Sequence, residues 1–178
     1  MKNKKSIYVQ DNFFNEEIFK TIQKEVISLE FKSRYSDISE ESSHDDPQYG
    51  DHQKTYHHVK LSSDSKGVLE VKKNIKKYFD YTVKTIESFY FLSFPNTPAI
   101  PHDDLCTYNC LIYLIGDKLI NNGTGFYEKF NDEYQLHTHI GFKENRAIFF
   151  NSSIYHSPLQ FAGNSTPRYI MANFCYDT

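Results

Sequence analysis

The sequence lacks tryptophan, contains few cysteines and has no long apolar run. A membrane-spanning helix needs about 18 or more consecutive apolar residues, and no stretch of the chain reaches that length. The lysine-rich start leads into "SIYVQDNFFNEE", which lacks the apolar core of a secretory signal. These absences predict a protein without a membrane anchor, and the simplest expected location is cytoplasmic.

The cysteines form an odd set, Cys106, Cys110 and Cys175, inside strand-like runs. Small secreted domains use even sets of cysteines as disulfide frameworks, whereas cytosolic proteins keep their thiols reduced. We therefore expect three reduced thiols and no zinc site built from cysteine.

An excess of basic residues is also missing, because 20 Lys and Arg face 23 Asp and Glu, a net charge of −3. Nucleic-acid-binding domains need a basic surface, so no nucleic acid partner is expected. The chain is instead rich in aromatic residues, with 14 Tyr and 15 Phe among 178 residues. A chain of this length suits one domain and can bury roughly 70% of its unfolded surface. We predict a single domain, residues 1–178.

The first part of the chain, residues 1–84, has a helical and polar pattern. Asn15 followed by Glu16 and Glu17 is typical of a helix start, since acidic residues favour the positive end of the helix dipole. Apolar residues then recur at helical spacing, at Phe19, Ile22, Val26 and Leu29. A second amphipathic helix is predicted after "SSDSKG", with an apolar stripe of Val68, Leu69, Val71, Ile75, Tyr78 and Phe79.

Between these helices, residues 32–67 form a polar stretch with little apolar periodicity. Such a length without a regular pattern predicts a lid, a binding loop or a partly disordered segment. Its four histidines suggest a metal site: His44, His52, His57 and His58. Because no strand is expected to fix them, the sequence favours a solvated loop.

From Thr85 the pattern changes to short runs rich in aromatic and β-branched residues, separated by Pro, Gly and Asn. Six strands are predicted, in "TIESFYFLSF", "LCTYNCLIYLI", "GTGFYEKF", "YQLHTHIGF", "RAIFFN" and "RYIMANFCY". The expected fold class is α+β, mostly β. We predict a double-stranded β-helix (jelly roll) over residues 85–178, with the N-terminal helices packed on the outer face of one sheet.

The tripeptide His-Asp-Asp occurs twice, in "SSHDDPQYG" and in "IPHDDLCTYNCLIYLI". The first copy lies in the polar stretch, whereas the second precedes a long, buried-looking strand. His102 and Asp104 stand two residues apart in an extended segment, so their side chains point to one side, as neighbouring ligands of one ion would. Asp103 is the rival carboxylate, but its side chain would point away from His102. The second copy is therefore the candidate metal-binding segment.

A metal site needs another ligand, and the later histidines are His137, His139 and His156. The "LHTHI" pair has the His-x-His spacing that cupins use, but no Glu is well placed after it, so we interpret both as surface or pocket-rim histidines. His156 is preferred, because it follows a buried strand and precedes a strand that carries Arg168.

With these residues in place, the sequence resembles the iron(II)/2-oxoglutarate-dependent dioxygenases, and more specifically their prolyl-hydroxylase-like branch. The resemblance covers residues 89–174, about the second half of the chain. It rests on the proximal His102 and Asp104, on "IYL", "NNGTGFY" and "RAIFFNSSIYHSPLQ", and on Arg168 after the distal histidine. The family's Tyr before the proximal histidine is replaced by Phe94, and its Arg-x-Ser is "RYI" here.

The resemblance implies an enzyme that binds iron(II) through His102, Asp104 and His156, with 2-oxoglutarate as cosubstrate and O2 as oxidant. Two histidines and one carboxylate on one face of iron leave three positions open. The implied reaction hydroxylates a C–H bond of a small-molecule or peptide substrate and releases succinate and CO2. No catalytic residue separate from the metal ligands is implied.

Arg168 is expected to bind the far carboxylate of 2-oxoglutarate, because a guanidinium can grip a carboxylate with two parallel hydrogen bonds. The resemblance gives Tyr113 a hydrogen bond to the same carboxylate. Alternation along "TYNCLIYLI" puts Asn109 on the face of Tyr113, so we place Asn109 beside it. The alternative hypothesis is a noncatalytic jelly-roll binding module or a cupin-like metal protein.

Overall fold

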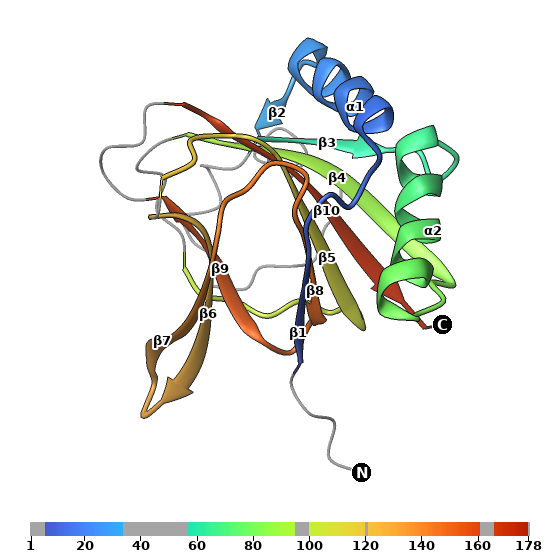
Figure 1. Cartoon of the computed structure of the whole chain (residues 1–178). Coiled ribbons are helices and arrows are strands. Elements are labelled where there is room, and N and C mark those ends of the chain that lie inside the picture. The colour runs from blue at the N-terminus through green and yellow to red at the C-terminus, as the bar shows by residue number, and fades with distance from the viewer. Residues whose placement is uncertain (1–5, 34–56, 95–99, 120, 161–165, 178) are drawn as a thin grey trace.

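Two antiparallel β-sheets pack against each other, and two helices cover the outer face of the larger sheet (Figure 1). The computed structural model describes residues 6–33, 57–94, 100–119, 121–160 and 166–177. The arrangement confirms the predicted α+β, mostly β jelly roll with N-terminal helices on one outer face.

The larger sheet has seven strands and the smaller sheet has three. In spatial order the larger sheet consists of β1 (Ile7–Gln10), β8 (Ala147–Asn151), β5 (Tyr108–Ile115), β10 (Arg168–Tyr176), β4 (Thr85–Ser93), β3 (His57–Leu61) and β2 (Lys32–Ser33). The smaller sheet consists of β7 (Glu133–Gly141), β6 (Asn122–Phe130) and β9 (Tyr155–Gln160). The larger sheet thus contains strands from both halves of the sequence.

Both helices, α1 (Glu16–Ser28) and α2 (Lys66–Phe79), begin at a capping side chain. Asn15 and Ser65 each accept a hydrogen bond from a backbone amide of the first turn, at 2.9 Å and 3.4 Å. Each bond satisfies a donor that has no partner within the helix. The first helix therefore begins where the sequence predicts. Neither of these helices is long and apolar enough to cross a membrane.

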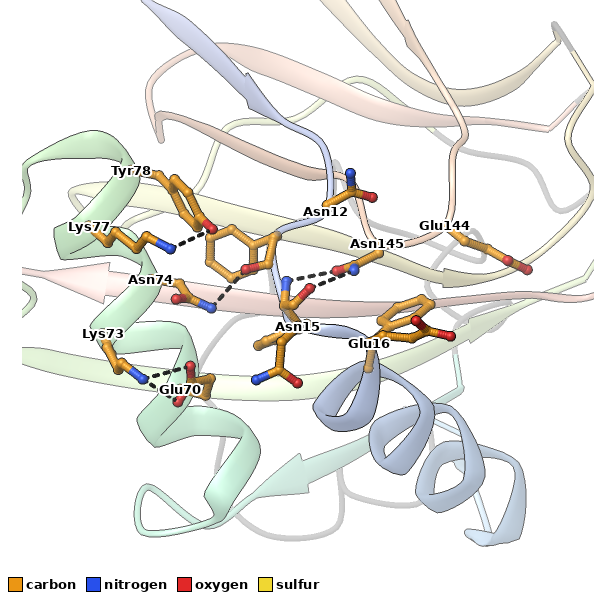
Figure 2. A pocket seen from close by; sticks show the side chains of 13 residues that line it. Asn12, Asn15, Glu16, Glu70, Lys73, Asn74, Lys77, Tyr78, Glu144 and Asn145 are labelled. Atoms are coloured by element: carbon orange, nitrogen blue, oxygen red, sulfur yellow. Dashed lines mark hydrogen bonds and ion pairs between the residues drawn. The ribbon is translucent and has the colours of Figure 1, made fainter.

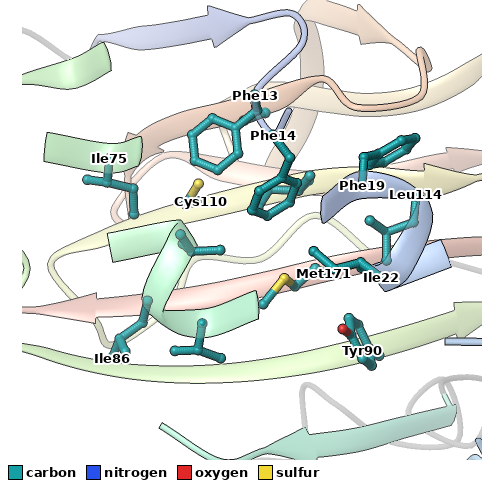
Figure 3. Close-up of a cluster of buried hydrophobic side chains, with 14 of the residues drawn as sticks. Phe13, Phe14, Phe19, Ile22, Ile75, Ile86, Tyr90, Cys110, Leu114 and Met171 are labelled. Atoms are coloured by element: carbon teal, nitrogen blue, oxygen red, sulfur yellow. The ribbon is translucent and has the colours of Figure 1, made fainter. Parts of the chain in front are cut away.

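Strand β5 separates two apolar cores, because successive side chains point to opposite faces of a strand. Cys110, Ile112 and Leu114 face the helices, in the core drawn in Figure 3. Leu111 and Tyr113 face the smaller sheet and form a second core with residues such as Phe126, Ile148 and Phe150. Burial on both faces explains why this strand is apolar throughout rather than alternating.

The segment between β1 and α1 is held in place by two buried asparagines (Figure 2). Asn74 of α2 donates to the Phe13 carbonyl at 2.8 Å. Asn145 donates to the Phe14 carbonyl at 2.9 Å and accepts from the Phe14 amide at 2.8 Å. These bonds satisfy backbone groups that no sheet partner reaches. The same asparagines line a pocket between the helices, and none of the predicted site residues takes part in it.

The structure corrects the sequence-based prediction at three places. His57 and His58, expected in a solvated loop, lie in β3, which pairs with β4 in the larger sheet. Strand β9 is absent from the prediction, because a proline such as Pro158 usually argues against a strand. Prolines are tolerated on edge strands, and β9 lies at the edge of the smaller sheet. Leu69 is 52% exposed and does not belong to the apolar stripe of α2. His44 and His52 lie outside the described residues.

A charged contact joins the end of β1 to the turn before β8. Oδ1 of Asp11 lies 2.6 Å from Nε of Arg146, and its Oδ2 lies 2.7 Å from Nζ of Lys143. The hydrogen bond from Arg146 is the main cause that lowers the pKa of Asp11 to about 2. A carboxylate with a lowered folded-state pKa adds stability above its unfolded pKa, and that stability is lost as the pH falls through the folded pKa.

Replacing Asp11 by Asn should lower the free energy of unfolding by about 1 kcal/mol at pH 7, because water screens a partly exposed pair. The difference from wild type should shrink as the pH falls from about 4 toward 2, which urea unfolding at several pH values can measure. Asp132→Asn is the matched control, since Asp132 pairs with Lys129 on an exposed turn, and it should leave stability unchanged. A D11N deficit that is independent of pH would contradict this account.

Candidate metal centre

The backbone brings the proximal and distal histidines together. His102 and Asp104 lie between β4 and β5, and His156 lies on β9. The His102 amide donates to the His156 carbonyl at 3.0 Å, and the His156 amide donates to the His102 carbonyl at 2.8 Å. The Asp104 amide donates to the Ser152 carbonyl at 3.1 Å. The segment with His102 and Asp104 is thus fixed against the strand that carries His156.

The three side chains converge on one point. Their potential ligand atoms all lie within 4.8 Å of one another, and the two imidazole centroids are 4.6 Å apart. Nδ1 of His102 lies 3.0 Å from the Ile100 carbonyl oxygen, and Nδ1 of His156 lies 3.0 Å from the Ile154 carbonyl oxygen. A proton on each Nδ1 can be donated to these carbonyls, which leaves Nε2 of each ring as the metal-binding nitrogen.

Asp104 supplies the carboxylate of this group. Burial alone would raise its pKa, but the hydrogen bond from His156, the nearby histidine charges and the amide of Asn109 together lower the pKa of Asp104. Its Oδ2 lies 3.3 Å from Nε2 of His156 and 2.7 Å from Nδ2 of Asn109. Asp103 is exposed and lies outside the group, which agrees with the preference for Asp104.

The surroundings of the group differ from one side to the other. His156 is 5% exposed, and its ring meets Phe150 edge-on at a centroid distance of 4.8 Å, with Phe126 behind at 6.5 Å. His102 and Asp104 are only partly buried. The site is therefore closed by aromatic rings behind His156 and accessible beside the other two ligands.

This set of donors fits a first-row transition metal such as iron(II). Two imidazole nitrogens and one carboxylate form the facial triad of non-haem iron, in which the remaining positions stay available for other ligands. Across the described ranges of the chain, His102, Asp104 and His156 are the one group of three or more His, Cys, Asp or Glu residues whose ligand atoms lie this close together.

A buried guanidinium and a buried hydroxyl lie near each other in the second core. Arg168, the first residue of β10, is 2% exposed, and its Nη1 contacts Oδ1 of Asn122 at 3.3 Å and the Gly123 carbonyl. The Tyr113 hydroxyl lies 2.7 Å from Oγ1 of Thr124. Burial raises the pKa of Tyr113 to about 12, although the positive charge of Arg168 opposes the shift. Tyr113 is thus a neutral hydroxyl beside a cation.

Asn109 lies on the same strand as Tyr113, and its side chain contacts the irregular segment before that strand. Its amide contacts Asp104, and its Oδ1 lies 3.2 Å from the thiol sulfur of Cys106. Neither the contact with Asp104 nor that with Cys106 has a signal in the sequence pattern, because both arise in the irregular segment before β5. Thr124, the partner of Tyr113, was likewise not singled out.

The His-x-His pair on β7 does not join the metal centre. His137 is exposed, with Nδ1 3.8 Å from Oε1 of Glu128, and His139 is half-buried. Neither belongs to the three-ligand group. Their placement agrees with the interpretation as surface or rim histidines.

No protein-family model matches the sequence, and no curated protein is significantly similar to it. Solved structures, by contrast, match the fold over nearly the whole chain. One is HygX from Streptomyces hygroscopicus, solved with nickel, 2-oxoglutarate and hygromycin B, with a TM-score of 0.65 and 11% sequence identity. The alignment covers 97% of this chain and 84% of HygX. Another is a prolyl hydroxylase from Trichoplax adhaerens in complex with a hypoxia-inducible-factor peptide, with a TM-score of 0.61 and 13% sequence identity. The alignment covers 98% of this chain and 85% of the hydroxylase.

Another similar structure is SnoN, a non-haem alpha-ketoglutarate-dependent epimerase from nogalamycin biosynthesis. Its TM-score is 0.65 and its sequence identity is 8%. The alignment covers 98% of this chain and 80% of SnoN. At sequence identities this low, the similarity shows a shared fold and nothing further. The chain therefore has the jelly-roll fold of the iron(II)/2-oxoglutarate-dependent oxygenases, and the resemblance seen in its motifs is confirmed at the level of architecture.

Proposed function

We propose that this protein is a non-haem oxygenase that depends on iron(II) and 2-oxoglutarate. The observation that carries the proposal is the convergence of His102, Asp104 and His156 within 4.8 Å, inside a fold shared with 2-oxoglutarate-dependent enzymes. The buried Arg168 adds support, because a dicarboxylate cosubstrate needs a cation at its far end.

In this proposal the three ligands hold iron(II) on one face. When bound, iron(II) with 2-oxoglutarate and O2 supplies the oxidising chemistry, in which 2-oxoglutarate is converted to succinate and CO2 and a substrate C–H bond is attacked. The carbonyls of Ile100 and Ile154 favour a proton on Nδ1 of each histidine, which makes Nε2 the nitrogen that would bind the metal. The rings of Phe126 and Phe150 exclude water behind His156.

The far carboxylate of 2-oxoglutarate is assigned to Arg168 and Tyr113. A buried guanidinium offers parallel N–H donors to a carboxylate, and burial makes these charge-assisted bonds strong. Tyr113 remains protonated at neutral pH, because its pKa is about 12, and it can therefore donate its hydroxyl hydrogen. In this structure the hydroxyl donates toward Thr124 and the Ile140 carbonyl, so its hydrogen would turn to the carboxylate when the cosubstrate binds.

The substrate is proposed to be a small molecule or a peptide, and the expected outcome is hydroxylation. Hygromycin B is bound in HygX, and a peptide is bound in the Trichoplax enzyme, so the fold accommodates both classes. SnoN is an epimerase, so the same fold also supports other outcomes. We further propose that residues 1–178 act as one domain in the cytoplasm.

The function can be tested without knowing the substrate. Adding iron(II) and 2-oxoglutarate under anaerobic conditions should produce the weak visible charge-transfer band of the chelated complex. Admitting O2 should then release succinate in step with the loss of 2-oxoglutarate. His102→Ala should abolish both signals. A wild-type protein that binds metal but gives neither band nor succinate would instead support the noncatalytic jelly-roll module or cupin-like protein.

The choice of carboxylate ligand gives a matched pair of variants. Asp104→Ala should weaken Co(II) binding, measured by calorimetry, by more than the roughly 10–100-fold that loss of an outer-shell partner costs. Asp103→Ala is the control, since Asp103 is exposed one residue away, and its Co(II) affinity should match wild type. Equal losses in the two variants would show that the effect comes from the segment rather than from the Asp104 ligand.

The cosubstrate site gives a second pair of variants. Arg168→Met should weaken 2-oxoglutarate binding by about 10–100-fold, because a buried carboxylate loses charge-assisted hydrogen bonds of roughly 1.5–3 kcal/mol. Tyr113→Phe should cost up to about tenfold, since a neutral hydrogen bond is worth less. Titration of the charge-transfer band measures both. Tyr127→Phe is the control, because the Tyr127 hydroxyl contacts Ser157 rather than Arg168 or Tyr113, and Co(II) affinity should be unchanged in all three. Wild-type 2-oxoglutarate affinity in R168M would refute the assignment.

A further inference from the structure

We propose that Asn109 is a positioning residue that holds Asp104 in the metal-binding arrangement before the metal arrives. The inference rests on the proposed metal centre. It begins from one contact, in which Nδ2 of Asn109 donates to Oδ2 of Asp104 at 2.7 Å. That same oxygen lies 3.3 Å from Nε2 of His156, so it is the oxygen presented toward the distal ligand.

Asp104 needs such a partner because an ionised carboxylate that is largely removed from water is stable only where donors surround it. Its Oδ2 has two side-chain neighbours, Nδ2 of Asn109 at 2.7 Å and Nε2 of His156 at 3.3 Å. Metal binding would commit Nε2 of His156 to the ion, whereas the Asn109 amide can keep its contact with Asp104. Asn109 is therefore the donor that holds Oδ2 both before and after the metal binds.

The backbone that carries Asn109 is well suited to this task. Asn109 is the second residue of the central strand β5 and is 1% exposed. It is paired on one side with Phe174 of β10 and on the other with Phe150 of β8. Asp104, in contrast, belongs to the irregular segment before β5, where its amide bonds the Ser152 carbonyl. The strand therefore orients the side chain of a ligand that lies outside regular secondary structure.

The amide of Asn109 is also held in one orientation. Its Oδ1 lies 3.2 Å from Sγ of Cys106, a thiol that has the Tyr108 carbonyl as a second acceptor at 3.3 Å. A flipped amide would face the carboxylate of Asp104 with its own oxygen, which is repulsive, and would lose the weak bond from the thiol. Both contacts thus favour the orientation in which the NH2 group meets Asp104.

Asn109→Ala and Asn109→Leu test the proposal. Alanine removes the whole amide, whereas leucine keeps the volume and branching but has no N–H. Both should weaken Co(II) binding by about 10–100-fold, as loss of an outer-shell partner does in metalloproteins. Calorimetry of the purified full-length chain with Co(II) measures this without any turnover assay, and circular dichroism shows that each variant is folded.

Asn173→Ala is the matched control. Asn173 is a buried asparagine on β10, paired with Cys110 of β5, and it bonds Ser88 and the Cys110 carbonyl rather than the metal centre. It should lower the melting temperature and leave Co(II) affinity unchanged. Folded N109A or N109L protein with wild-type Co(II) affinity would overturn the role of Asn109 alone. Wild-type protein that binds no Co(II) would overturn this role and the proposed function together.

Discussion

The pairing of the His102 and His156 main chains is the contact on which the site depends. Two hydrogen bonds fix both residues at one place, so their imidazoles meet before any ion is bound. Asp104 follows within two residues of His102 and is aimed by the rigid strand β5 through Asn109. The inner face of that strand also carries Tyr113, which lies near the buried Arg168. One strand thus carries Asn109, which contacts the proposed metal centre, and Tyr113, which lies near the buried cation.

The parts of the molecule that could be predicted from the sequence have local signals. Asn15 before two glutamates gives the start of α1, and the alternating or continuous apolar runs give six of the strands. The His102 and Asp104 pair follows from spacing in an extended segment. His156 could be singled out because it follows a buried strand and precedes the strand that carries Arg168, and the structure pairs its main chain with that of His102.

The remaining features depend on contacts that no periodicity encodes. β9 contains a proline and is an edge strand, so its pattern does not resemble that of the central strands. β3 has two histidines in a polar neighbourhood, and its pairing with β4 and β2 makes it a strand. Alternation correctly put Asn109 and Tyr113 on one face. It could not tell that the irregular turn before β5 returns Asp104 to within hydrogen-bond distance of Asn109.

In the proposed enzyme, one metal ion is held by His102, Asp104 and His156, and the cosubstrate reaches from that ion to Arg168. An anaerobic crystal structure with Mn(II) and 2-oxoglutarate tests both contacts at once. We expect Mn(II) bound to Nε2 of both histidines and to the Asp104 carboxylate, with the far carboxylate of 2-oxoglutarate against Arg168. A metal ion bound elsewhere, such as at His137 and His139, with no metal at these three side chains, would show that the proposed metal centre is wrong.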